Sequence, residues 1–230
     1  LSPGLVAHYF DQGDAENVFD TMRQATLAVN AEFIPLMAAR TAEMGGRWQA
    51  AEDLYLKAYA SQMDDIGILR IMADFYVRHA PTAPENAGKA ARYLNRILRM
   101  ANEQEVEQTH PAVMWARTEA AKMLASQGDY QSSVKAEKML SHAMAVAKEK
   151  EAIAGQLADV LAARGDPESR LRAANLFLDL KEETGLTQAG DLRLAQMLFE
   201  VGVWNQCKRH MNDVVSRYPR VVCVRPFYIS

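Results

Sequence analysis

Four cations with helical spacing are the most suggestive chemical feature of this sequence. This basic stripe consists of Lys89, Arg92, Arg96 and Arg99. Steps of three, four and three residues place its members on one face of a helix, where they could dock an acidic partner. The alternative is a solvated outer face, because Glu85 precedes the stripe by four residues and Glu103 follows it by four.

The other reactive side chains do not form a recognisable catalytic or metal-binding motif. The five histidines are scattered, without an HExxH sequence or an i,i+4 pair. There is no phosphate-binding loop, dinucleotide fingerprint or G-x-S-x-G motif. Cys207 occupies a small-residue position and is predicted to be a packed core thiol. We therefore expect no enzymatic activity, no metal and no cofactor in this chain.

The composition is that of a folded helical protein. The 230 residues are 49% apolar and 24% charged, which is enough for a continuous core and argues against wholesale disorder. The modest 12 Gly and 8 Pro disfavour a turn-rich all-β fold. No stretch approaches the roughly 18 uninterrupted apolar residues that a membrane-spanning helix needs.

The charge balance argues against a nucleic-acid-binding protein, because such proteins usually carry a basic surface and the net charge here is −3. Residues 1–65 carry 4 basic and 10 acidic side chains, a net of −6, whereas residues 66–150 carry 12 and 9, a net of +3. Two cysteines cannot form a disulfide framework, which slightly favours a cytoplasmic location. The chain begins without Met and is interpreted as a piece of a longer protein, with any targeting signal outside it.

The helices that must position these side chains follow an internal repeat. In each unit a helical run with a small residue leads to a glycine turn and then to a second run. The turn glycines are Gly13, Gly46, Gly128, Gly165 and Gly202, at intervals of 33, 82, 37 and 37 residues. The long interval accommodates one extra unit, interrupted by Pro81 and Pro84. A fixed period of this size is typical of stacked helical repeats.

This layout resembles the tetratricopeptide repeat (TPR), a helix-turn-helix unit of about 34 residues. The last full unit matches best, through Leu194, Ala195, Leu198, Gly202, Trp204, Cys207, Met211, Val214 and Pro219. The resemblance implies an all-α fold, a right-handed α-solenoid of about six stacked units. We place the units at 1–31, 32–65, 66–109, 110–150, 151–187 and 188–221, with 222–230 as the truncated start of a further unit.

In TPR proteins the first helix of each unit lines a concave groove that binds a ligand. Transferred by position, this pattern implies the groove residues Phe33, Arg40, Arg70, Asp74, Arg78, Trp115, Lys122, Asp159 and Gln196. The same transfer places Glu43, Gly155 and Glu200 in the groove. The Lys/Asn set with which some members hold a chaperone's C-terminal carboxylate is absent. The implied groove is mixed in character and would suit a peptide or a helix.

The resemblance favours a protein–protein interaction scaffold that binds a protein or peptide partner. The alternative is a regulatory or specificity domain attached to a catalytic module outside this sequence. An RNA-reading helical repeat is disfavoured by the net acidity and by the absence of a recurrent base-reading pair. Self-association through the repeat ends is a further hypothesis, because the end units of a stack expose unpaired faces.

Overall fold

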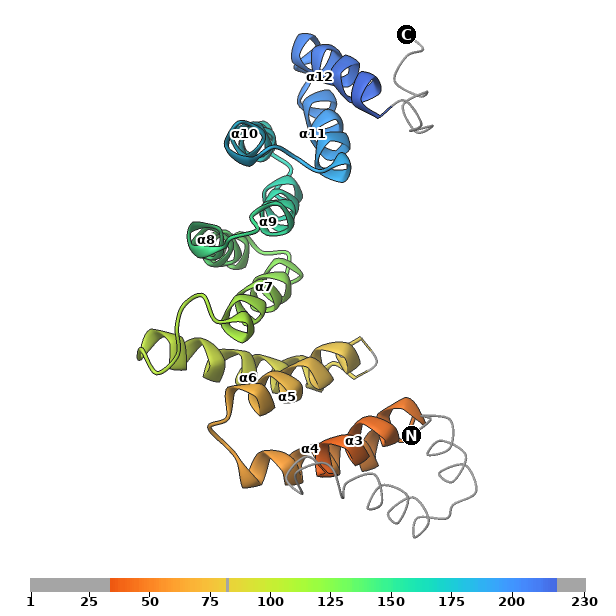
Figure 1. Cartoon of the computed structure of the whole chain (residues 1–230), viewed down its shortest axis with the longest axis vertical. Coiled ribbons are helices and arrows are strands. Elements are labelled where there is room, and N and C mark those ends of the chain that lie inside the picture. The colour runs from red at the N-terminus through yellow and green to blue at the C-terminus, as the bar shows by residue number, and fades with distance from the viewer. Residues whose placement is uncertain (1–33, 82, 219–230) are drawn as a thin grey trace. The chain divides into compact units, whose positions relative to one another are not determined.

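The computed structural model describes residues 34–81 and 83–218 (Figure 1). These residues form ten α-helices and no strand, which confirms the all-α prediction. The helices are α3 (Ile34–Met44), α4 (Trp48–Ser61), α5 (Ile66–His79), α6 (Glu85–Asn102), α7 (Pro111–Ala125), α8 (Tyr130–Val146), α9 (Glu151–Ala163), α10 (Pro167–Thr184), α11 (Gln188–Val201) and α12 (Trp204–Arg217). The predicted units 1–31 and 222–230 and the groove residue Phe33 lie outside the described residues.

The chain divides into two compact units, residues 1–97 and 98–230, and each is described by itself. In the described part of the first unit, aromatic side chains join successive helices. The rings of Tyr55 in α4 and Phe75 in α5 have centroids 5.0 Å apart. The ring of Tyr76 in α5 stacks on Tyr93 of α6 at 5.7 Å. Each of these helices therefore has an aromatic face that packs against its neighbour.

The second unit is a stack in which each helix from α7 to α12 packs against the next along the chain. Small residues such as Ala158 and Ala195 are buried at the helix crossings, where they let the backbones approach. Larger side chains, among them Phe177 and Leu194, fill the space between the helices in one continuous core. No helix in the described ranges is long and apolar enough to cross a membrane.

Local signals in the sequence set the helix boundaries. Asp65, Asp129 and Asp166 each precede a helix and accept a hydrogen bond from the backbone N–H three residues later. Such caps satisfy N–H groups that the first helical turn leaves unpaired. Gly46 and Gly202, two of the repeat glycines, end helices with φ of +71° and +79°. Glycine adopts this left-handed conformation without steric cost, so the chain can reverse direction there.

Candidate functional site

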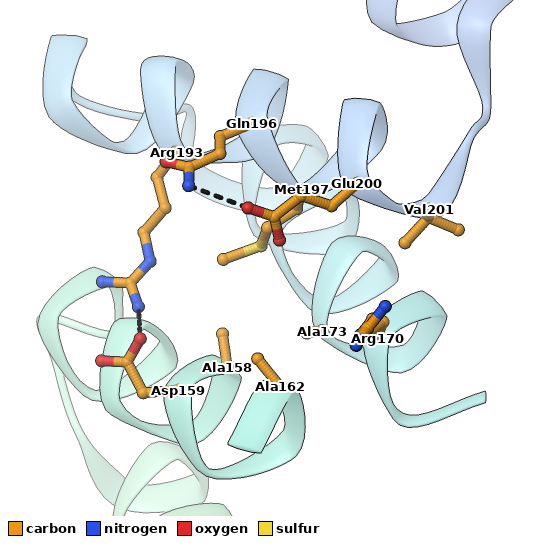
Figure 2. Close-up of a pocket in the computed structure, with 10 residues that line it drawn as sticks. All are labelled: Ala158, Asp159, Ala162, Arg170, Ala173, Arg193, Gln196, Met197, Glu200 and Val201. Atoms are coloured by element: carbon orange, nitrogen blue, oxygen red, sulfur yellow. Dashed lines mark hydrogen bonds and ion pairs between the residues drawn. The ribbon is translucent and has the colours of Figure 1, made fainter. Parts of the chain in front are cut away.

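Three predicted groove residues, Asp159, Gln196 and Glu200, line the same pocket in the second unit. The pocket has a volume of about 370 Å³ and lies between α9, α10 and α11 (Figure 2). Asp159 enters it from α9 and Gln196 from α11. Its lining consists of Ala158, Asp159, Ala162, Arg170, Ala173, Arg193, Gln196, Met197, Glu200 and Val201.

Arg193 spans this pocket from α11 to α9. Its Nη2 donates a hydrogen bond of 2.9 Å to the carbonyl oxygen of Gly155, and the same nitrogen pairs with the Asp159 carboxylate. A Cβ at Gly155 would lie 3.0 Å from the Arg193 guanidinium, so the glycine gives the cation room to approach the backbone. Transfer of the TPR pattern did not identify Arg193. The available signal was its position three residues before Gln196, which places both on one helix face.

The pocket combines an apolar floor with a polar rim. The floor is formed by Ala158 and Ala173, which are buried, and by the half-buried Met197. On the rim, Nε2 of Gln196 donates to Oε1 of Glu200 at 2.8 Å (Figure 2). Such a site can bury an apolar side chain of a ligand and offer hydrogen bonds to the polar groups beside it.

A second pocket, of about 580 Å³, is also lined by residues of α9 and α11. Arg193 and Gly155 line it, so Arg193 belongs to both pockets. At its far side the Glu151 carboxylate accepts hydrogen bonds from the backbone N–H of Thr187, at 2.9 Å, and from the Thr187 hydroxyl. Thr187 caps the start of α11, so this contact fixes where α11 begins against α9.

In the first unit, two predicted groove residues converge on a buried carboxylate. The carboxylate belongs to Glu43, which is only 4% exposed. It pairs with Arg40 at 3.0 Å, with Arg78, and with Nε2 of His79 at 3.2 Å, and it accepts a 2.9 Å hydrogen bond from Tyr55. The expectation that Glu43 faces the groove is therefore wrong. Its carboxylate instead joins α3, α4 and α5, because Tyr55 of α4 and Arg78 and His79 of α5 contact it.

The environment of Glu43 keeps it ionised. Burial opposes ionisation, but hydrogen bonds from Tyr55 and His79 and the charge of Arg78 outweigh it and hold the pKa of Glu43 below its usual value. Burial and the hydrogen bond to Glu43 raise the pKa of Tyr55 to about 12. Arg78 also pairs with Asp74 one helical turn away, at 3.0 Å. The predicted groove residues Arg40, Asp74 and Arg78 thus take part in a network of charges with Glu43.

The remaining predicted groove residues in the described chain do not line the two pockets. Arg70 is exposed on α5 of the first unit. In the second unit, Trp115 is half-buried on α7, and the exposed Lys122 pairs with Glu119 of the same helix at 2.7 Å. Their assignment to a groove stays a prediction.

The basic stripe lies on α6, and two of its members form ion pairs with α4 or the turn after it. Nζ of Lys89 lies 2.6 Å from Oε1 of Glu52, and Nη2 of Arg96 lies 2.7 Å from Oδ1 of Asp64. The other two members, Arg92 and Arg99, are exposed. The stripe therefore serves packing within the first unit as well as presenting charge to solvent.

Two reactive side chains of α12 serve its packing against α11. Cys207 is buried, as predicted, and its thiol donates to the carbonyl oxygen of Ala195 at 3.5 Å. His210 is also buried, and its Nε2 lies 2.8 Å from the carbonyl oxygen of Asp191. Across residues 34–81 and 83–218, no group of three His, Cys, Asp or Glu side chains could hold a metal ion.

Comparison with solved structures identifies the fold, although no family model and no curated protein sequence matches the chain. PilW, a widely conserved type IV pilus biogenesis factor, is similar with a TM-score of 0.61 and 14% identity, over 98% of this chain and 96% of its own. A tetratricopeptide repeat protein from Parabacteroides merdae has a TM-score of 0.56 and 16% identity, over 93% of this chain and 77% of its own.

The TPR-like repeats of a kinesin light chain from Podosopora anserina have a TM-score of 0.58 and 16% identity, over 80% of this chain and 93% of their own. Identities this low establish the fold alone. The chain has a TPR-like helical-repeat fold, which confirms the resemblance seen in its sequence.

Proposed function

We propose that this chain is a protein-interaction scaffold that binds a peptide segment of a partner protein. The peptide would lie in the groove that the two pockets sharing Arg193 form along α9 and α11. The observation that carries the proposal is the shared pocket of Asp159 and Gln196, two residues that the TPR resemblance assigns to the ligand-binding side. Helical repeats present such concave surfaces as binding sites. The fold and the position of the pocket therefore support the same role.

The chemistry of the groove defines the kind of peptide it would accept. The small side chains Ala158, Ala162 and Ala173 leave room for one apolar side chain of the ligand. The Gln196 amide can donate to or accept from a peptide backbone, and the rim carries both a cation, Arg193, and an anion, Glu200. A peptide with an apolar anchor flanked by polar residues fits this arrangement.

We infer that the role is binding rather than catalysis. Displaced pKa values often mark active sites, but interhelical pairs also produce them. Here the pKa of Glu43 is low because of its interhelical partners, and that of Glu52 is low despite burial because Lys89 and Tyr76 donate to it. Each of these shifts accompanies a contact that holds helices together, which supports a scaffold.

The test is selection of peptides from a random displayed library with the purified chain, followed by affinity measurement on two variants. Ala162→Trp fills the pocket, because Ala162 is exposed at its lining. Ala145→Trp adds the same indole at an exposed position of α8 outside this lining. We expect A162W to weaken binding at least about tenfold, or 1.4 kcal/mol, and A145W to leave it unchanged. Selected peptides that bind A162W as tightly as the unmodified chain would contradict the proposal.

A further inference from the structure

Arg117 of α7 is a buried cation whose contacts are all to neutral groups. It is 4% exposed, and its guanidinium donates to the carbonyl oxygen of Gln108 at 3.1 Å and to the side-chain oxygen of the same residue. Its remaining contact is to the sulfur of Met114 at 3.9 Å. Burial lowers the pKa of Arg117, with no carboxylate to oppose the effect. Buried charges in proteins are normally paired with an opposite charge, so this arrangement needs an explanation.

Other arginines of the second unit show the usual arrangement. Arg164, with a side chain 8% exposed, lies 2.6 Å from a carboxylate oxygen of Glu137. Arg217, which is far more exposed, lies 2.9 Å from a carboxylate oxygen of Asp191. Arg117 is more buried than either and yet has only neutral acceptors. In the described chain no ion pair therefore compensates the lost hydration of its charge.

Arg117 lines a pocket of about 250 Å³ that also contains the cation Lys138 and the imidazole of His142. The lining residues are Leu98, Asn102, Arg117, Lys138, Met139 and His142, none of them acidic. Leu98 and Asn102 come from the C-terminal end of α6, which belongs to the second unit, and the others come from α7 and α8. Among the ion pairs of the described chain, none joins Arg117, Lys138 or His142 to a carboxylate. The glutamates in the connection before α7, Glu103, Glu105 and Glu107, are exposed.

We propose that this pocket binds a phosphate group, either free phosphate or the phosphorylated side chain of a protein. Arg117 and Lys138 together supply two positive charges, which match the near-dianionic charge of a phosphate monoester at neutral pH. A guanidinium fork fits the phosphate oxygens geometrically, and Asn102 and His142 add donors. The apolar walls Leu98 and Met139 reduce contact with water and so strengthen these charge-assisted bonds. This site shares no lining residue with the α9–α11 groove, so either proposal can fail without the other.

The test is calorimetric titration of the purified full chain with inorganic phosphate at constant ionic strength. Lys138→Gln combined with His142→Gln removes the exposed ammonium and imidazole groups of the pocket without touching the buried arginine. Lys135→Gln removes an exposed charge from the same helix, outside the pocket lining. We expect the double variant to weaken phosphate binding about tenfold and K135Q to change it less than about twofold. Absence of binding to the unmodified chain, or equal losses in both variants, would overturn the proposal.

Two further titrations identify the source and the specificity of the ligand. A phosphoserine peptide that binds more tightly than inorganic phosphate assigns the site to a phosphoprotein, and equal affinity assigns it to free phosphate. If acetate bound as tightly as phosphate, the pocket would not select a dianion, and the proposal would be overturned. Arg117→Met, which fills the buried volume without charge, should abolish phosphate binding. If R117M fails to fold, the double variant still decides the outcome.

Discussion

The hydroxyl of Tyr55 donates a 2.9 Å hydrogen bond to Oε2 of Glu43, and both side chains are buried. Tyr55 lies on α4 and Glu43 on α3, while the same carboxylate also meets Arg78 and His79 of α5. A single carboxylate therefore ties three consecutive helices of the first unit. A charge this buried is tolerated because hydrogen bonds and opposite charges compensate its lost hydration.

Tyr55→Phe should lower the free energy of unfolding of the first unit by about 1–2 kcal/mol, because it leaves a buried lone pair of Glu43 without its donor. Faster hydrogen exchange of the amides of α3 and α4 would report the loss. Tyr59→Phe is the matched control on the same helix, since the half-buried Tyr59 ring contacts Tyr93 edge-on at 5.3 Å. Equal effects of Y55F and Y59F would show that the hydrogen bond to Glu43 is not what stabilises the unit.

The structure also shows which parts of the molecule were predictable from sequence. Gly46 and Gly202 end helices because the turn needs a left-handed residue, a local requirement that the glycine spacing reveals. The TPR resemblance places Asp159 and Gln196 on the same side of their units, and both line one pocket. The burial of Glu43 was not predictable, because its partner Arg78 lies 35 residues further along the chain. The period determines which face a residue occupies, but the charges opposite it come from other helices.

Arg193 makes two kinds of interaction with α9, a hydrogen bond and an ion pair, and each can be tested individually. Arg193→Ala removes the hydrogen bond to the buried Gly155 carbonyl and should destabilise the second unit by about 1 kcal/mol. Asp159→Ala removes only the ion pair, in which Asp159 is 70% exposed, and should cost less than about 0.5 kcal/mol. Hydrogen exchange of the α9 and α11 amides measures both. If D159A destabilised the second unit as much as R193A does, the stabilisation would be assigned to the ion pair.

His210 makes the C-terminal hairpin of the second unit sensitive to acid. Its imidazole contacts the Asp191 carbonyl through Nε2, and its Nδ1 lies 3.0 Å from Nζ of Lys181, which donates to the neutral ring. Burial lowers the pKa of His210, and the charge of Lys181 adds to this, while Asp191 and Asp213 only partly oppose it. At pH values between the folded-state pKa of His210 and 6.5, the unfolded chain binds more protons than the folded chain. The contribution of His210 to stability is therefore complete above about pH 6.5 and is lost as the pH falls through the folded-state pKa.

We expect the urea midpoint of the chain to fall as the pH is lowered from about 7.5 to 5, with increased exchange in α11 and α12. His210→Gln should reduce this dependence, because glutamine does not titrate. His142→Gln removes an exposed imidazole of the same unit and should leave the dependence in place. A pH dependence that survives unchanged in H210Q would assign it to another group.

Gly46 and Gly88 offer a matched test of backbone conformation in the first unit. A Cβ at either position would meet no atom within 4 Å, so packing does not distinguish the two substitutions. Gly46 has φ of +71°, where a side chain is strained, and Gly46→Ala should destabilise the unit by about 1 kcal/mol. Gly88 lies within α6, and Gly88→Ala should stabilise it by about 0.5–1 kcal/mol because alanine loses less backbone entropy. Thermal unfolding would show opposite shifts of the midpoint, whereas shifts of the same sign would mean that the left-handed turn is not required at Gly46.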